Sequence, residues 1–407
     1  MRNTDRTLVT ALESLPGNAR VVASGNFAAP LQLLSVLDAA VPAYRLNMLN
    51  AQPGIPVRDG VTHETSFVGP GMRYSDSLVY VPSRLSLLPR LFGSTLAPDV
   101  VVLHTSTPHQ GTVSLGTEVN VLPAAIEAVR RTGGLVIAQM NTQMPYTFGD
   151  GVIPVEWIDH WITVDEPLMS PAKVELDDAA QEIGRLIALR VADGATLQTG
   201  IGAVPDATLM QLTGHRGLGI WTEMFSDGML ALDRAGALDQ ERVVTSSFVF
   251  GSPELYSWVH RNPRVRLLRT ETTNDPSLIR QNDRMVSVNS ALQVDLFGQA
   301  NASRIGRRIY SGTGGQTDFV VGAMHAPEGQ ALVALRSWHP RADCSTIVPL
   351  VDEPVTSSQM TAVITEQGTA EIFGHDQRAQ TRHLIEGASH PSVREELWEE
   401  AHALHLG

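Results

Sequence analysis

The sequence predicts an α/β protein made of two tandem α/β domains of similar topology, each with a mostly parallel sheet. Short apolar runs typical of buried strands alternate with amphipathic runs typical of helices, a pattern that favours a parallel sheet covered on both faces. The chain has 407 residues, enough for two or three domains at roughly 100 to 200 residues each. A unit of helix, strand, glycine loop and helix also occurs twice, once early and once near the middle of the chain.

The first domain is predicted at residues 1–172. Thr4 can cap an opening helix, a buried strand follows at 19–23, and Pro30 opens a second helix after the turn Ser24–Gly25–Asn26. Further strands are predicted at 44–49, 61–67, 78–81, 100–104 and 135–139, and further helices at 83–92 and 121–131.

The second domain is predicted at residues 173–407, beginning with a long amphipathic helix at 175–192. A strand at 195–198 then leads through a glycine loop into a new helix, which repeats the opening of the first domain. Strands are also predicted at 218–221, 243–250, 265–268, 285–289, 292–296 and 363–366, and helices at 229–235, after Ser252–Pro253, after Asp275–Pro276, from Asp376 and at 391–404.

Composition limits the classes of partner. The net charge of −13 disfavours binding to nucleic acid and to anionic membranes, and no apolar run approaches the length of a membrane span. The single cysteine, Cys344, cannot form an internal disulfide, and the N-terminus lacks the apolar core of a signal peptide. We therefore expect a cytoplasmic protein. No metal site is expected, because the 13 histidines are scattered.

The stretch Trp221–Gly228 contains the candidate nucleophile, Glu223. An apolar strand precedes this carboxylate and the turn residues Ser226–Asp227–Gly228 follow it, which places Glu223 at a strand end, where open α/β sheets bind ligands. A solvated loop acid is the alternative interpretation of these eight residues.

Two glycine-rich stretches could bring backbone N–H groups close to a ligand. Gly312 to Gly315 has the flexibility for oxyanion or phosphate binding, although a tight structural turn explains its glycines equally well. Gly200–Ile201–Gly202, before a helix, suits a phosphate at a helix N-terminus. The stretch Gly312 to Gly315 is neither a Walker loop nor a dinucleotide fingerprint.

Taken together, the sequence resembles the class I coenzyme A transferases, in the acetyl-CoA hydrolase/transferase branch that includes 4-hydroxybutyrate CoA-transferases. The resemblance covers nearly the whole chain. The stretches that carry it are Ser66–Pro70, Leu88–Phe92, Ala138–Asn141, Gly200–Ala207, Glu223–Gly228, Asn289–Leu296, Ser311–Phe319 and Thr365–Glu366.

The resemblance implies a role for individual residues. Glu223 matches the family's nucleophilic glutamate, Gly315 matches the amide that stabilises the oxyanion, and Glu366 is a candidate for lining the acyl end. The residues implied to contact coenzyme A are Gly200, Ile201, Gly202, Ala203, Val204, Asn274, Gly312, Gly314 and Gln316. Many relatives of the 4-hydroxybutyrate type read Thr-Glu-Tyr-Gly where this chain has Thr365–Gly368 with Gln367, which leaves the acyl substrate open.

The function implied is that of an acyl-CoA:carboxylate CoA-transferase that works by ping-pong catalysis through a glutamyl-CoA thioester, on short-chain acyl-CoA such as acetyl-, butyryl- or 4-hydroxybutyryl-CoA. Coenzyme A is then a substrate, and no permanently bound cofactor is expected. We expect a homo-oligomer that binds acyl-CoA and a carboxylate. The alternatives are an acyl-CoA hydrolase that uses the same site and a catalytically silent acyl-CoA-binding protein.

Overall fold

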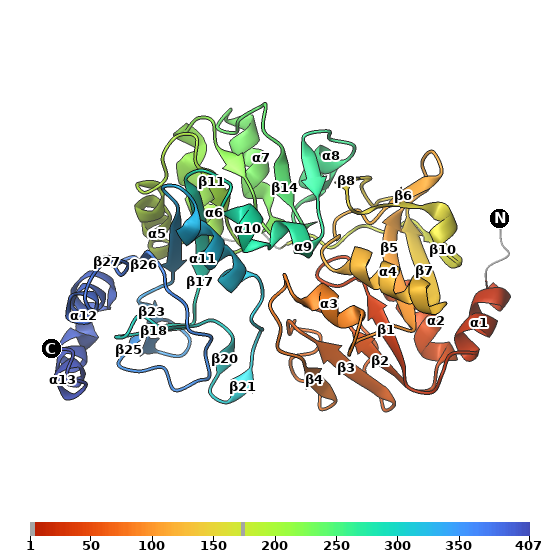
Figure 1. Cartoon of the computed structure of the whole chain (residues 1–407), viewed down its shortest axis with the longest axis horizontal. Helices are drawn as coiled ribbons and strands as arrows, with labels where there is room; N and C mark the ends of the chain where they lie inside the picture. Colours follow the sequence, from red (N-terminus) through yellow and green to blue (C-terminus); the bar gives the residue numbers. More distant parts are fainter. Residues whose placement is uncertain (1–4, 172–175) are drawn as a thin grey trace. The chain divides into compact units, whose positions relative to one another are not determined.

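The structure, a computed structural model, describes residues 5–171 and 176–407. The chain forms two compact units (Figure 1). The first consists of Met1–Pro171, Thr245–Thr273 and Ile309–Gly314, and the second of Ala172–Val244, Asn274–Arg308 and Gly315–Gly407. Two later segments of the chain therefore return to the first unit. The predicted boundary at residue 172, the start of the helix predicted at Glu175 and the predicted cap Thr4 lie outside the described residues.

The first unit is built on a seven-stranded sheet in which every pair of neighbours is parallel. In order across the sheet its strands are β10 (His160–Val164), β7 (Leu135–Asn141), β5 (Val100–Ser106), β1 (Ala19–Ala23), β2 (Tyr44–Asn47), β3 (Val61–Thr65) and β4 (Leu78–Tyr80). Its helices are α1 (Asp5–Glu13), α2 (Leu31–Ala40), α3 (Leu88–Phe92), α4 (Leu122–Thr132), α8 (Pro253–Val259) and α9 (Thr270–Thr273). Leucines of α1 and α2 pack with apolar strand residues into one core.

The second unit is built on a six-stranded sheet. Its order is β12 (Gly219–Ile220), β11 (Thr196–Gln198), β17 (Met285–Ser290), β22 (Gln330–Ala334), β26 (Ala362–Thr365) and β27 (Gly368–Glu371). All neighbours are parallel except β27, which runs antiparallel to β26. Its helices are α5 (Asp178–Ala188), α6 (Ala203–Gln211), α7 (Asp227–Arg234), α10 (Pro276–Ile279), α11 (Gln316–His325), α12 (Gln377–His383) and α13 (Arg394–Ala403). The predicted fold class is confirmed.

Shorter elements complete the chain. They are the strands β6 (Thr112–Ser114), β8 (Phe148–Gly149), β9 (Val152–Pro154), β13 (Met224–Phe225), β14 (Val244–Ser246), β15 (Phe248–Val249), β16 (Val265–Leu267), β18 (Gln293–Asp295), β19 (Ala300–Asn301), β20 (Arg304–Ile305), β21 (Arg308–Ile309), β23 (Trp338–His339), β24 (Cys344–Ser345) and β25 (Ile347–Val348), the 3₁₀ turns at Val155–Trp157, Leu212–Gly214 and Pro391–Val393, and a π-helical turn at Leu384–Ala388.

Several predicted helix starts are confirmed by their caps. The Asp275 carboxylate accepts a hydrogen bond from the Ser277 backbone N–H at 2.8 Å, and the Asp376 carboxylate accepts one from the Ala379 N–H at 2.9 Å. Each bond satisfies an N–H group that the first turn of a helix leaves without an intrahelical partner.

A helix and a strand are among the predicted elements that were wrong in extent. The helix predicted from residue 83 begins only at Leu88, because Pro89 has no N–H and is tolerated only in the first turn. The strand predicted at 243–250 is divided into β14 and β15 at Ser247, where the Ser246 hydroxyl donates to the Phe248 carbonyl at 3.0 Å. Such local side-chain bonds compete with a regular strand ladder.

None of the helices within residues 5–171 and 176–407 combines the length and the apolar character that crossing a bilayer requires. Over the same two ranges, no three or more His, Cys, Asp or Glu side chains gather as a metal ion would need.

Candidate active site

Glu223 lies just beyond the carboxyl end of β12, as the sequence predicted. The parallel ladder between β11 and β12 extends to a bond from the Trp221 N–H to the Leu197 carbonyl at 3.1 Å. The chain then leaves the sheet, passes through Glu223 and β13, and enters α7 at Asp227. The residue is partly exposed, although Thr222 and Met224 on either side of it are buried. Glu223 therefore lies in a loop in which the residue on each side of it is buried.

Two residues from distant parts of the second unit's sequence contact the Glu223 carboxylate. The Asn274 side-chain amide, which is fully buried, donates a hydrogen bond to Oε2 at 2.9 Å. Gly315 also lies directly beside this oxygen, because a Cβ added to Gly315 would overlap both Glu223 Oε2 and Asn274 Nδ2. The backbone of Gly315 is in a right-handed conformation (φ −97°), so a glycine is required here by space and not by its dihedral angles.

The packing of two helices explains why Asn274 and Gly315 meet. Asn274 directly precedes the cap of α10, and Gly315 is the N-terminal cap residue of α11. Ile279 of α10 joins Phe319, Val320 and Ala323 of α11 in one buried cluster with residues of β17 and β22. The helices approach closely, because a Cβ on Gly322 would overlap Ile279. Their N-terminal ends, which carry partial positive charge, consequently lie beside the Glu223 carboxylate.

The electrostatic surroundings of Glu223 favour its neutral form relative to an ordinary glutamate. Withdrawal of the carboxyl from water raises its pKa to about 7; the hydrogen bond from Asn274 lowers the pKa and the negative charge of Asp318, on α11, raises it. Asp318 is fully buried. A carboxylate with a pKa close to neutrality is both more basic than usual and substantially ionised at pH 7, a combination that suits a nucleophile or a general base.

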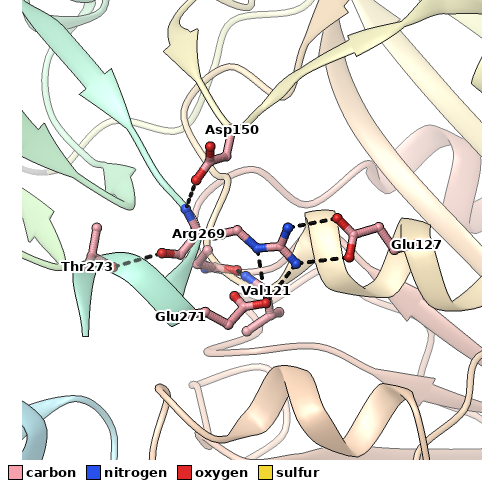
Figure 2. A network of polar contacts seen from close by, with 7 residues as sticks. Val121, Glu127, Asp150, Arg269, Glu271 and Thr273 are labelled. Carbon is pink, nitrogen blue, oxygen red and sulfur yellow. Dashed lines mark hydrogen bonds and ion pairs between the residues drawn. The ribbon is translucent and has the colours of Figure 1, made fainter. Parts of the chain in front are cut away.

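The turn that leads to Asn274 is anchored in the first unit by Arg269 (Figure 2). The Arg269 guanidinium donates two hydrogen bonds to Glu127 of α4, at 2.7 and 3.1 Å, and two to Glu271, at 3.0 and 2.7 Å. These bonds, those to Glu127 above all, raise the pKa of Arg269, and the same pairing lowers the pKa of Glu127. The bidentate pairing between Arg269 and Glu127 fixes the orientation of both side chains.

The backbone of Arg269 takes part in the same network. Its N–H donates to the Asp150 carboxylate at 3.0 Å, and its carbonyl accepts from the N–H of Thr273 at 3.1 Å (Figure 2). Thr273 is the last residue of α9 and precedes Asn274. The short helix α9, which directly precedes Asn274, is therefore held at its start by side-chain and backbone hydrogen bonds.

The loop Gly200–Ile201–Gly202 follows β11 and leads into α6. Gly202 is the cap residue of α6 and has a φ of 114°, a conformation that favours glycine. A Cβ on Gly200 or on Gly202 would meet no atom within 4 Å, so the space beside both glycines is open. Ala203 and Val204 form the first turn of α6 and are partly exposed. This geometry allows an anionic group to approach the helix N-terminus.

Gly312 and Gly314 lie in the first unit, whereas Gly315 and Gln316 lie in the second. A Cβ on Gly312 would overlap the Ser66 carbonyl, and Gly314, with a φ of 58°, packs against the Phe67 ring. Close packing within the first unit therefore accounts for these two glycines, and their predicted contact with coenzyme A stays a prediction. Gln316 is the first residue of α11 and is partly exposed.

Glu366 is not brought beside Glu223. It follows β26, and three strands of the sheet separate β26 from β12, which corresponds to roughly 20 Å between the two strands. Its carboxylate accepts bonds from the Ser337 backbone N–H, at 2.9 Å, and from the Ser337 hydroxyl. Burial favours its neutral form, but these bonds outweigh that effect and hold the pKa of Glu366 below its usual range. Its role at the acyl end stays a prediction.

Asp318 and Thr222 were not among the site residues predicted from the sequence. Asp318 resembles an ordinary acid in the first turn of a helix, and its proximity to Glu223 follows only from the placement of α11. Thr222 could have been noted as the direct neighbour of the candidate nucleophile. Its fully buried hydroxyl donates to the Thr199 carbonyl, 3.0 Å away, at the start of the glycine loop.

Comparisons with known proteins identify the family of the chain. The sequence pattern of the acetyl-CoA hydrolase/transferase N-terminal domain matches residues 11–172, and the pattern of the C-terminal domain of the same family matches residues 251–401. The chain is 34% identical over 417 residues to the 4-hydroxybutyrate coenzyme A transferase of Clostridium kluyveri, an alignment that covers 97% of this chain and 96% of that protein.

Two solved structures share the fold over nearly the whole chain. The 4-hydroxybutyrate CoA-transferase of Porphyromonas gingivalis has a TM-score of 0.83 at 31% identity, with 98% of this chain and 96% of that chain covered. RipA of Yersinia pestis has a TM-score of 0.91 at 26% identity, with 100% and 98% covered. The protein is therefore an enzyme of the acetyl-CoA hydrolase/transferase family, to which CoA-transferases belong.

Proposed function

We propose that the protein transfers coenzyme A from a short-chain acyl-CoA, such as acetyl-, butyryl- or 4-hydroxybutyryl-CoA, to a carboxylate, through a glutamyl-CoA thioester on Glu223. The observation that carries the proposal is the environment of Glu223. Asn274 orients its carboxylate, Gly315 leaves room beside it, and its pKa is about 7. The names of the relatives in Clostridium kluyveri and Porphyromonas gingivalis support this class of substrate.

The chemistry follows from a carboxylate nucleophile. Glu223 attacks the thioester carbonyl of acyl-CoA, the coenzyme A thiolate leaves, and a mixed anhydride forms between the acyl group and Glu223. The thiolate then attacks the Glu223 carbonyl and releases the acyl group as a carboxylate, which leaves a thioester between Glu223 and coenzyme A. An incoming carboxylate reverses both steps and departs as the new acyl-CoA, so the activation of the thioester is conserved.

The neighbours of Glu223 have separate tasks in these steps. The hydrogen bond from Asn274 limits the orientations of the attacking carboxylate, which lowers the entropy lost in reaching the transition state. Gly315, at the N-terminus of α11, is the residue whose N–H we assign to the tetrahedral oxyanion. The open loop from Gly200 to Val204 would bind coenzyme A beside the N-terminus of α6.

An assay with and without a carboxylate acceptor distinguishes coenzyme A transfer from hydrolysis. Free thiol release from acetyl-CoA is measured with and without butyrate or 4-hydroxybutyrate, while new acyl-CoA is followed by chromatography. A transferase forms the new thioester and releases little thiol in either case, because a closed site keeps water from the glutamyl thioester. Equal thiol release in both cases with no new acyl-CoA would show a hydrolase, and no turnover of any kind would show a binding protein.

The transferase rate should rise with pH through about pH 7. Protonated Glu223 cannot attack, and its pKa is about 7, whereas the carboxylate acceptors stay ionised over this range. Replacing Asn274 by alanine removes a bond that lowers this pKa, so the acid limb should move to higher pH. A hydrogen bond to a charged group is worth about 1.5–3 kcal/mol, which corresponds to a rise of about one to two units in the pKa of Glu223, so we expect the ratio of the rate at pH 6 to the rate at pH 8 to fall by about five- to ninefold. An unchanged limb would show that another group sets the pH dependence.

A further inference from the structure

Two side-chain hydrogen bonds connect the loop that carries Glu223 to residues on either side of the glycine loop Gly200–Val204. On one side, the Thr222 hydroxyl lies 3.0 Å from the Thr199 carbonyl oxygen and 2.9 Å from that of Met224, so its single hydrogen is shared between the two acceptors. On the other side, the Ser226 hydroxyl donates to the Asp206 carboxylate at 3.0 Å. Thr199 precedes Gly200, and Asp206 lies in the first turn of α6.

The Thr222 hydroxyl forms the next hydrogen bond between the two chains, just beyond the end of the strand ladder. The last backbone bond between β11 and its neighbour joins the Trp221 N–H to the Leu197 carbonyl, and beyond it the two chains separate into their loops. The Thr222 side chain and the Thr199 residue are both buried, at 0% and 1% exposure. A hydrogen bond in this setting is shielded from competing water, so it fixes the separation of the two loops more firmly than a surface bond would.

The helices that follow the two loops are also packed on each other. Gly228 of α7 lies against Leu209 of α6, because a Cβ on Gly228 would overlap that leucine side chain. Figure 1 shows α6 and α7 as neighbours in the second unit. The helices therefore hold the far ends of the loops, and Thr222 holds the near ends, next to the reacting carboxylate.

We propose that Thr222 is a positioning residue that sets the distance between the nucleophile Glu223 and the coenzyme A loop at Gly200–Val204. This inference rests on the proposed function, because it takes Glu223 as the nucleophile and the glycine loop as the site of the thioester's coenzyme A. Thr222 touches neither the substrate nor the reacting atoms in this account. It acts through the Thr199 carbonyl, so that a bound acyl-CoA meets the Glu223 carboxylate at attacking distance.

The test uses Thr222→Val, which keeps the shape of the side chain and removes its hydroxyl, and Thr222→Ser, which keeps the hydroxyl. In rapid-quench experiments with saturating acetyl-CoA, Thr222→Val should form the glutamyl thioester at least roughly tenfold more slowly, since a small misplacement of reacting groups lowers rates strongly. Its affinity for acetyl-CoA should change less than threefold. Thr222→Ser should recover most of the rate.

A matched control is Thr381→Val. Thr381 is also fully buried and its hydroxyl donates to the Leu296 carbonyl at 3.0 Å, but it lies on α12, which packs at the β27 edge of the sheet, opposite β12. This variant should lose thermal stability and keep its rate. If Thr222→Val does not fold, the difference between Thr222→Ser and Thr222→Ala isolates the hydroxyl in the same way.

The outcomes are distinguishable. A wild-type rate of thioester formation in folded Thr222→Val, or equal rates in Thr222→Ser and Thr222→Ala, would overturn the positioning role while the wild-type thioester on Glu223 still supports the proposed function. If thioester formation were as slow in Thr381→Val as in Thr222→Val, the slow rate would reflect a general loss of stability, and the positioning role of Thr222 would be overturned. No thioester on Glu223 in the wild-type protein would remove the proposed function itself.

Discussion

Replacing Glu223 by glutamine is expected to lower the transferase rate by at least about a thousandfold, because the amide has the size of the carboxylate and lacks its nucleophilic oxygen. The amide can still occupy the space beside Asn274 and Gly315, so the fold around it should persist. Steady-state kinetics with acetyl-CoA and a carboxylate acceptor, together with a thermal unfolding curve, measure the two effects separately.

The size of the Glu223 effect can be compared with two further variants. Glu223→Asp should lose on the order of a hundredfold, since shortening the side chain by one methylene withdraws the attacking oxygen by about 1 Å. Glu182→Gln changes an exposed acid on α5 in the same unit, where it pairs with Arg185, and should leave the rate unchanged. Transferase activity at the wild-type level in Glu223→Ala would exclude the carboxylate from the chemistry.

The second large effect is expected from Gly315→Ala, which should lower the transferase rate by on the order of a hundredfold. The added methyl group would overlap both Glu223 Oε2 and Asn274 Nδ2, so the carboxylate, the amide or α11 must move. A displacement of about 1 Å at the reacting centre has an effect of this size. The backbone angles of Gly315 are accessible to alanine, so the loss should appear in kcat more than in thermal stability.

Gly214→Ala provides the matched control for Gly315→Ala. Gly214 also lies in the second unit, and a Cβ there would meet no atom within 4 Å. Its rate should equal that of the wild-type protein. If Gly315→Ala retained a rate within threefold of wild type, the close contact between Gly315 and the carboxylate would have no part in catalysis.

The fold was largely predictable because its main signals are local. Alternating strand and helix patterns indicated parallel sheets, and the turn residues at Asp275–Pro276 and Asp376 marked helix starts that the structure confirms. The errors also have local causes that pattern alone underweighted. Pro89 delayed a helix start, and the serine pair at 246–247 divided a predicted strand.

The arrangement of the candidate site was less accessible from sequence. The resemblance indicated Glu223, Asn274 and Gly315, but their convergence depends on how α10 and α11 pack through Ile279 and Phe319. No periodicity reports that packing, and the same holds for the effect of Asp318 on the Glu223 pKa.

The two glycine-rich stretches differ in what surrounds their glycines. Gly200 and Gly202 border open space, whereas Gly312 and Gly314 pack against Ser66 and Phe67. Both stretches look alike in the sequence, because glycine serves ligand approach and close packing equally well. Only the surroundings of each glycine separate the two uses.

We expect Glu223 to carry coenzyme A as a covalent thioester, and peptide mapping detects that intermediate on the residue itself. The protein is incubated with acetyl-CoA without an acceptor, treated with borohydride, digested and analysed by mass spectrometry. The reduced product, an alcohol in place of the carboxyl, is expected on the peptide containing Glu223, and a large excess of acceptor carboxylate over acetyl-CoA, added before borohydride, should strongly reduce its amount. Reduction of a different acid, or an unmodified Glu223 in an enzyme that turns over, would contradict the covalent role of Glu223.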